Sequence, residues 1–166
     1  MATITLRGNA IHTSGELPKV GSAAPDFKLT DAELKDLSLA DFKGKKKLLN
    51  IFPSIDTPTC AKSTHKFDEA ATKHGNTVML MISADLPFAM SRFCGAENTK
   101  VVKTLSMMRD RHFAKDYGVL ITDGPLAGIC ARAVVVLDEQ NKVLYTELVP
   151  EIAQEPNYEK ALAVLK

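Results

Sequence analysis

The chain has 166 residues, of which 45% are hydrophobic, and its 21 Lys and Arg against 20 Asp and Glu give a formal net charge of +1. This length and composition predict one globular domain over residues 1–166 with a real hydrophobic core. The balanced charge argues against a general binder of nucleic acid or of anionic membranes, and no apolar run approaches the ~20 residues of a transmembrane helix. We therefore expect neither a nucleic acid nor a membrane as partner.

The first dozen residues alternate between apolar and polar side chains, which predicts a β-hairpin whose two strands turn at Gly8-Asn9. They lack a basic start followed by an apolar stretch, so we expect no secretory signal and a cytoplasmic location. Short strands are predicted at residues 27–30 and 37–39. The three lysines at 45–47 are predicted to form a solvated turn.

Two runs, residues 48–52 and 77–82, are apolar on both faces and are predicted to be central strands of a covered sheet. Between them the apolar spacing predicts a helix over residues 58–73, which ends near Gly75. This strand–helix–strand order predicts a βαβ unit with parallel strands and a right-handed crossover.

The second half of the chain continues the alternation of strands and helices. A second helix is predicted over residues 86–94, with Asp85 as its N-cap and Gly95 at its end. The further predicted elements are a strand at 101–105, a helix at 111–117, a central strand at 133–137, a hairpin partner at 143–145 and a last helix from residue 156. The whole order predicts a single α/β domain without internal repeats or linkers.

The three cysteines, Cys60, Cys94 and Cys130, are odd in number and no signal peptide is expected before them. A disulfide framework of the kind found in secreted proteins is therefore a poor explanation for them. No CxxC pair or Cys/His cluster has the spacing of zinc ligands, so we expect no metal and no cofactor. Each cysteine is either a reactive thiol or a small buried hydrophobic residue.

The segment from Phe52 to Cys60 leaves a buried strand and enters a helix at the sheet edge where open α/β sheets bind ligands. Thr57 is a good N-cap and Pro58 suits the first helical position, which places Cys60 in the first turn. The free N–H groups and partial positive charge of that turn favour a thiolate. They contribute only about 0.3–1 kcal/mol, so a dominant thiolate needs a further cation, for which an arginine is the natural candidate. Spacing by itself equally allows Cys60 to be a buried helix residue.

The pattern Pro53-x-x-x-Thr57-x-x-Cys60 matches the active-site motif of the peroxiredoxins. Blocks of sequence that resemble the thiol peroxidase (Tpx) subfamily, the atypical 2-Cys type, lie at residues 50–57, 83–89, 91–95 and 132–136. The resemblance spans nearly the whole chain, and the N-terminal hairpin is also a subfamily feature. It implies a thioredoxin-like α/β fold, with a central mixed sheet flanked by helices and an N-terminal β-hairpin, and a homodimer.

The resemblance also implies roles for five residues. Cys60 is the peroxidatic nucleophile, and Thr57 hydrogen-bonds the peroxide and the thiolate. Pro53 shields the thiolate from water, and Arg132 holds and activates both thiolate and peroxide. Cys94 is the resolving cysteine of the same subunit.

These roles imply a thiol-dependent peroxidase of antioxidant defence, acting on hydrogen peroxide and alkyl hydroperoxides. The Cys60 sulfenic acid would condense with Cys94 to an intrasubunit disulfide, and thioredoxin would reduce that disulfide. Because the two cysteines lie on different predicted helices, and a disulfide needs Cα atoms within about 7 Å, we expect local unwinding before they meet. Cys130 has no counterpart in this pattern, and packing is the favoured interpretation.

Several alternatives remain open on the sequence. Arg132 begins an apolar strand, where it could also extend its head group to solvent. Thr57 stands where a thioredoxin has the first cysteine of CxxC, so a thiol–disulfide oxidoreductase is one rival and a non-catalytic redox-sensing module is another. Apolar residues that could surround an alkyl tail, or equally form the core, are Phe52, Ile55, Phe88, Met90 and Phe93.

Overall fold

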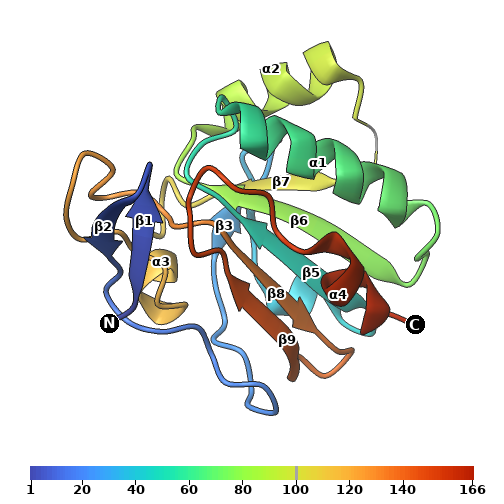
Figure 1. Ribbon diagram of the computed structural model, residues 1–166. Coiled ribbons are helices and arrows are strands. Elements are labelled where there is room, and N and C mark those ends of the chain that lie inside the picture. The colour runs from blue at the N-terminus through green and yellow to red at the C-terminus, as the bar shows by residue number, and fades with distance from the viewer. Residues whose placement is uncertain (100) are drawn as a thin grey trace.

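The computed structural model describes residues 1–99 and 101–166, and its elements alternate along most of the chain (Figure 1). The strands are β1 (Thr3–Leu6), β2 (Asn9–His12), β3 (Leu29–Thr30), β4 (Asp36–Leu37), β5 (Lys46–Ile51), β6 (Thr77–Ser83), β7 (Lys103–Ser106), β8 (Ala133–Leu137) and β9 (Val143–Leu148). The helices are the 3-10 turn η1 (Leu39–Phe42), α1 (Pro58–Ala71), α2 (Pro87–Glu97), α3 (His112–Asp116) and α4 (Tyr158–Ala163).

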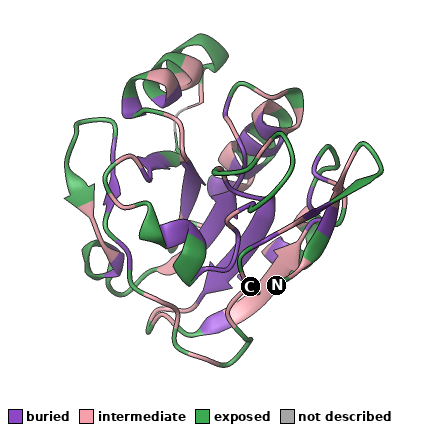
Figure 2. Cartoon of the chain, turned by 90° about the vertical axis from the view of Figure 1, so that its left-hand side faces the viewer, coloured by how far each residue is buried: buried purple, intermediate pink, exposed green. Residues whose placement is uncertain are grey.

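A seven-stranded mixed sheet in the order β4-β3-β7-β6-β5-β8-β9 forms the centre of the molecule. β5, β6 and β7 run parallel to one another, whereas β8 is antiparallel to both β5 and β9. The predicted βαβ unit is therefore present, with Ile51 of β5 beside Ile82 of β6. In Figure 2 the central strands are buried and the outer faces of the helices are exposed.

The two faces of the sheet carry separate hydrophobic clusters, because alternate residues of a strand point to opposite sides. Leu48 of β5 packs in a cluster with α1 and α4, which includes Phe67 and Ala161. Leu49 packs on the other side in a cluster that includes Phe113 of α3 and Ile4 of the N-terminal hairpin. The sheet thus holds α1 and the hairpin in fixed places on opposite sides.

The N-terminal hairpin is present, but its turn lies one residue earlier than predicted. Leu6 pairs with Asn9, so the central turn residues are Arg7 and Gly8, with φ angles of 51° and 83°. Two positive φ angles are the requirement of a type I′ turn, which matches the twist of paired strands. Gly8 favours this register, because a glycine adopts the positive φ angle of the second turn position without steric cost.

The start and end of α2 also differ from the prediction. Asp85 is not the N-cap, because Pro87 takes the first helical position and makes Leu86 the N-cap residue. The helix runs through Gly95 and ends at Asn98, whose φ of 58° supplies the left-handed cap expected of the glycine. Cys94 therefore lies inside the last turns of α2.

Only part of the predicted lysine turn is solvated. β5 begins at Lys46, and Lys47 is fully buried. Its Nζ donates to Asn141 Oδ1 at 2.6 Å in the β8–β9 turn. Burial lowers the pKa of Lys47, and the hydrogen bond compensates in part for the lost hydration. Among the described residues, no helix combines the length and the hydropathy needed to cross a membrane.

Candidate active site

Cys60 lies in the first turn of α1, at the carboxyl edge of β5. Thr57 is the N-cap, with extended φ and ψ of −87° and 145°, and Pro58 follows it at the first helical position. The Thr57 hydroxyl oxygen lies 2.7 Å from Cys60 Sγ and accepts a hydrogen bond from the Cys60 N–H at 3.4 Å. Cys60 is fully buried, so its sulfur is surrounded by protein groups rather than by bulk water.

Arg132 supplies the cation that the sequence required. It precedes β8 directly, is only 2% exposed, and its Nη1 donates to Cys60 Sγ at 3.2 Å. Its Nε donates to the Ile152 carbonyl at 2.8 Å. The guanidinium is therefore turned inward, and the alternative of a solvent-directed head group is wrong. In residues 1–99 and 101–166 Arg132 forms no ion pair with a carboxylate, and the hydrogen bonds of its side chain go to the Cys60 sulfur and the Ile152 carbonyl.

The loop that holds Arg132 is itself fastened to the N-terminal hairpin. Thr5 N donates to the Pro150 carbonyl at 2.8 Å, and Ile152 N donates to the Thr5 carbonyl at 2.9 Å. The Glu151 carboxylate accepts from Ala153 N at 2.9 Å and from Gly8 N at 2.9 Å, and these two hydrogen bonds lower the pKa of Glu151. The loop runs beside β1 as a short parallel bridge, so the hairpin stabilises the carbonyl that orients Arg132.

A pocket of about 310 Å³ opens beside the two groups that contact the sulfur. Buried Pro53 lines it together with Thr57 and Arg132. The rest of the wall comes mainly from the hairpin, the 126–129 segment and the Ile152 loop, and includes Leu6, Arg7, Leu126, Ile129, Ile152 and Ala153. A small molecule in this pocket would meet Thr57 and Arg132 together with a wall that is apolar apart from a few polar residues such as Arg7.

The apolar residues proposed from the sequence for this wall do not line it. Phe52, Ile55 and Met90 belong to the core between the sheet and the helices. Phe88 is 64% exposed and lines a different surface pocket with Leu86. Phe93 is partly buried and packs against the same core. The core interpretation was therefore correct for four of the five residues, and the wall of the pocket comes from segments distant in sequence.

Cys94 forms no disulfide in this structure, where all three cysteines are free thiols. It lines a separate cavity of about 610 Å³ together with Ala71, at the far end of α1. On either side of Cys94 in the sequence, Phe93 and Glu97 contact His65 of α1: the Phe93 ring lies tilted against the His65 ring at 6.4 Å, and Glu97 Oε2 lies 2.9 Å from His65 Nε2. Since α-helices rise 1.5 Å per residue, His65 lies about 7.5 Å beyond Cys60 along α1. The arrangement agrees with the expectation that the cysteines need local unwinding to meet.

Cys94 also differs from Cys60 in its electrostatic surroundings. Burial raises the pKa of its thiol, the Asp68 carboxylate raises it further, and a hydrogen bond with Thr99 opposes the two. A raised pKa keeps the thiol protonated and unreactive at neutral pH as long as α2 stays folded.

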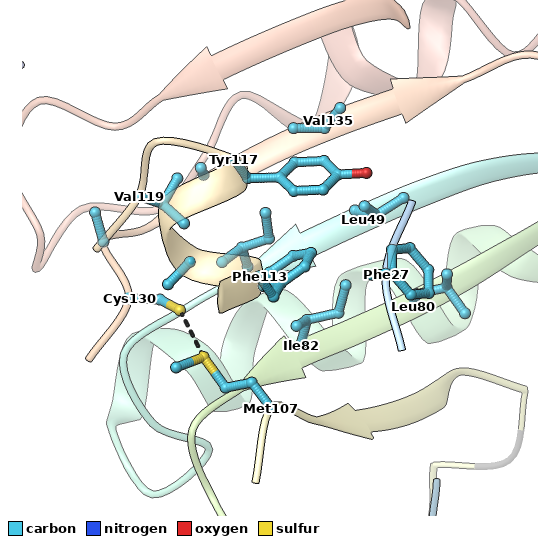
Figure 3. Close-up of a cluster of buried hydrophobic side chains, with 14 of the residues drawn as sticks. Phe27, Leu49, Leu80, Ile82, Met107, Phe113, Tyr117, Val119, Cys130 and Val135 are labelled. Atoms are coloured by element: carbon cyan, nitrogen blue, oxygen red, sulfur yellow. Dashed lines mark hydrogen bonds between the residues drawn. The ribbon is translucent and has the colours of Figure 1, made fainter. Parts of the chain in front are cut away.

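Cys130 is packed in the cluster on the opposite face of the sheet, where its Sγ lies 3.4 Å from Met107 Sδ (Figure 3). Burial raises the pKa of its thiol to about 12. Because β8 begins only at Ala133, strand alternation does not place Cys130 on the side of Arg132. The favoured packing interpretation agrees with this environment.

Two groups near the site were missed in the sequence. The Ile152 carbonyl orients Arg132, and as a main-chain group in a loop it leaves no signal in residue type. The Asp85 carboxylate accepts hydrogen bonds from the loop before α1; Pro87 was the available signal, since a proline at the first helical position makes the preceding residue the N-cap. Within the described part of the chain, no cluster of three or more His, Cys, Asp or Glu could hold a metal ion.

Comparisons with known proteins agree with this geometry. The Redoxin family model matches residues 19–162. Thiol peroxidases from Mycobacterium tuberculosis and Mycobacterium bovis are 62% identical over 165 residues, covering 99% of both chains. The crystal structure of a peroxiredoxin-like protein from Aquifex aeolicus is 38% identical and superimposes with a TM-score of 0.92 over 99% of this chain and 96% of that one. The predicted thioredoxin-like fold with an N-terminal hairpin is thereby confirmed, and the chain belongs to the Redoxin family and, within it, to the thiol peroxidases.

Proposed function

We propose that this protein is a thiol-dependent peroxidase that reduces hydrogen peroxide and alkyl hydroperoxides. The observation that carries the proposal is the position of Cys60 Sγ, 2.7 Å from the Thr57 hydroxyl and 3.2 Å from Arg132 Nη1. Family membership, with thiol peroxidases 62% identical over nearly the full chain, supports it.

In the first step the Cys60 thiolate attacks one peroxide oxygen and the O–O bond breaks. The sulfur becomes a sulfenic acid, and the other oxygen leaves as water or an alcohol after taking up a proton. Negative charge moves from sulfur to the leaving oxygen, so a donor that touches both stabilises the transition state. Arg132 and Thr57 line the pocket inside which the leaving oxygen would lie, and buried Pro53 limits competing water.

In the second step the Cys94 thiol attacks the sulfenic sulfur, forms an intrasubunit disulfide and releases water. This step needs the end of α2, and the first turn of α1, to unwind. We propose that thioredoxin then reduces the disulfide by thiol exchange, with its own two thiols oxidised in turn. No metal or other cofactor takes part.

We further propose that residues 1–166 act as one domain, that the protein works in the cytoplasm and that it forms a homodimer. The three free thiols fit a reducing compartment. Leu86 and Phe88 are exposed apolar side chains next to the loop that leads to Cys60. In the proposed homodimer the second copy of the chain would cover such a surface.

A coupled assay tests the function. Wild-type protein with thioredoxin, thioredoxin reductase and NADPH should consume NADPH only when hydrogen peroxide or cumene hydroperoxide is added. The Cys60→Ser variant should lose turnover by on the order of 10³-fold or more, since the nucleophile is removed. Cys130→Ala is the matched control and should keep wild-type turnover. Absence of peroxide-dependent NADPH loss in the wild type would overturn the proposal.

An insulin-reduction assay, together with the coupled assay, separates the two rival functions. A thiol–disulfide oxidoreductase would reduce insulin without peroxide, but Thr57, not a second cysteine, contacts the Cys60 sulfur. A redox-sensing module would oxidise Cys60 once and then turn over slowly or not at all.

A further inference from the structure

The Asp85 carboxylate connects the segment before α2 to the loop before Cys60. Oδ1 accepts a hydrogen bond from Ser54 Oγ at 2.8 Å, and Oδ2 accepts from Ile55 N at 2.7 Å and from Ser83 Oγ at 2.5 Å. We propose that Asp85 is a positioning residue for the peroxidase reaction, acting on Cys60 through Ser54 and Thr57. The proposal rests on the proposed function.

Asp85 is well suited to act as a fixed point, because the sheet holds its main chain. Its N–H donates to Ser83 Oγ at 3.2 Å, and its carbonyl accepts from Ser106 Oγ at 2.5 Å. Ser83 and Ser106 end the neighbouring parallel strands β6 and β7 and pair with each other. The Asp85 side chain therefore ties the loop before α1, which is not part of a strand, to the ends of two central strands.

The link from that loop to the sulfur passes through Thr57. The Ser54 carbonyl lies 3.2 Å from Thr57 N, which donates to it, and 3.1 Å from Thr57 Oγ1. The same Oγ1 lies 2.7 Å from Cys60 Sγ. A hydroxyl carries one proton, so it donates either to the Ser54 carbonyl or to the sulfur. A protonated thiol permits the first choice, and a thiolate requires the second.

The position of Ser54 therefore sets the balance between these two choices. If the loop shifts, the distance from its carbonyl to Oγ1 changes, and so does the direction from which Thr57 faces the sulfur. Misplacement of a reacting group by about 1 Å can cost up to 10²-fold in rate. An ionised Asp85 is acceptor-only and matches its three donors, whereas the capping role predicted from the sequence is excluded by Leu86 as the N-cap.

Asp85→Asn is the sharpest single substitution, because it keeps the shape of the side chain. An asparagine has one acceptor oxygen and one donor amide group, so it cannot accept from both the Ile55 N–H and the Ser54 hydroxyl in their present orientations. Asp56→Asn is the matched control. Asp56 lies in the same loop, but its side chain is 63% exposed, and among the residues that the structure describes its carboxylate pairs with Arg92 alone, at 3.8 Å.

The rate constant for oxidation of Cys60 is measured by competition with a haem peroxidase for limiting hydrogen peroxide. We expect Asp85→Asn to lower this constant by about 10-fold and Asp56→Asn to change it by less than about twofold. A merely structural role would reduce the fraction of reactive thiol, counted by alkylation, and leave the rate constant of the remaining fraction unchanged. A reduced reactive fraction with an unchanged rate constant would therefore overturn the proposal.

The double variant Ser54→Ala/Asp85→Asn tests the route. If Asp85 acts through Ser54, the double variant should lose about as much as Asp85→Asn does, whereas independent losses would multiply and contradict the route. Should Asp85→Asn fail to fold, Ser54→Ala must by itself lower the rate constant by about threefold or more. A wild-type protein that does not react with peroxide refutes the proposed function; a reactive wild type with an unaffected Asp85→Asn refutes only the positioning role.

Discussion

Cys60 and Cys94 lie at opposite ends of neighbouring helices, and their surroundings differ in nearly every respect. Cys60 is fully buried in the first turn of α1, where a hydroxyl and a guanidinium contact its sulfur. Cys94 is partly exposed in the last turns of α2, where its helix carbonyls are unfavourable to an anion and Asp68 adds negative charge. One environment stabilises a thiolate, and the other keeps a thiol neutral.

This difference separates the two chemical steps in the proposed cycle. The attacking sulfur has to be ionised before peroxide arrives, so its stabilising groups are built into the folded state. The resolving sulfur has to remain unreactive until the first oxidation has taken place. Its activation therefore requires a change of conformation rather than a different partner.

Apart from the loss of the Cys60 nucleophile itself, the largest expected effect comes from removing the thiol of Cys94. Cys94→Ser should still be oxidised once by peroxide at the wild-type rate, since Cys60 keeps its contacts. Steady-state turnover with thioredoxin should fall by on the order of 10²-fold or more, since no disulfide can form. Rapid-quench mass spectrometry of the first oxidation, together with the coupled assay, checks both halves. Undiminished turnover would show that Cys94 is not the resolving thiol.

Arg132→Lys tests the other side of the comparison. A lysine cannot donate at once to the Ile152 carbonyl and to the Cys60 sulfur with the geometry of a guanidinium. We expect the rate constant for peroxide oxidation of Cys60 to fall by about 10²-fold. Arg92→Lys is the control, because the Arg92 side chain is 75% exposed and its ion pair with Asp56 is long, at 3.8 Å. Equal effects from the two variants would remove Arg132 from the mechanism.

The raised pKa of Cys94 predicts how pH acts on the end of α2. A raised pKa favours the protonated thiol in the folded helix; this contribution is fully present below the ordinary thiol pKa of about 8.5 and is lost as pH rises through the folded value. Opening of α2 near Cys94, measured by hydrogen exchange corrected for intrinsic rates, should therefore increase by about threefold between about pH 7 and about pH 9.5. Cys94→Ser has no such group at this position, and its opening should be flat with pH; a rise of the same size there would contradict the assignment.

The smallest effect is expected at the third cysteine. Cys130→Ala removes a buried sulfur that contacts Met107 and should lower the free energy of unfolding by about 1 kcal/mol. Peroxidase activity should stay at the wild-type level. Urea unfolding followed by circular dichroism gives the first value, and the coupled assay gives the second. A loss of activity without a loss of stability would reveal a redox role for Cys130.

Strong local patterns made much of the fold predictable. The apolar runs that became β5, β6 and β8, and the Thr57-Pro58 start of α1, depend on side chains close together in sequence. The start of α2 was misplaced because Asp85, a good N-cap residue, was favoured over the position that Pro87 required. Lys47 was placed in solvent because its buried partner, Asn141, lies far along the chain.

The candidate site, like the fold, was predictable where it depends on residues close together in the sequence. The helix position of Cys60 and the need for an arginine follow from local chemistry, and the resemblance supplied which arginine. The pocket wall was not predictable, because Leu6, Leu126 and Ile152 come from three separate segments that only the tertiary structure assembles. A main-chain carbonyl that orients a guanidinium leaves no trace in side-chain type.

The attachment of the 150–152 loop to β1 has a practical consequence for anyone who handles this protein. Arg132 is oriented by the Ile152 carbonyl, and hydrogen bonds to Thr5 hold that carbonyl in place. Affinity tags or truncations at the amino terminus therefore lie a few residues from the hydrogen bonds that hold the Ile152 carbonyl. In the described part of the chain, the last helix, which ends at Ala163, forms no hydrogen bond with the hairpin. Purification handles belong at the carboxyl terminus, and kinetic data from amino-terminal fusions should be compared with cleaved material.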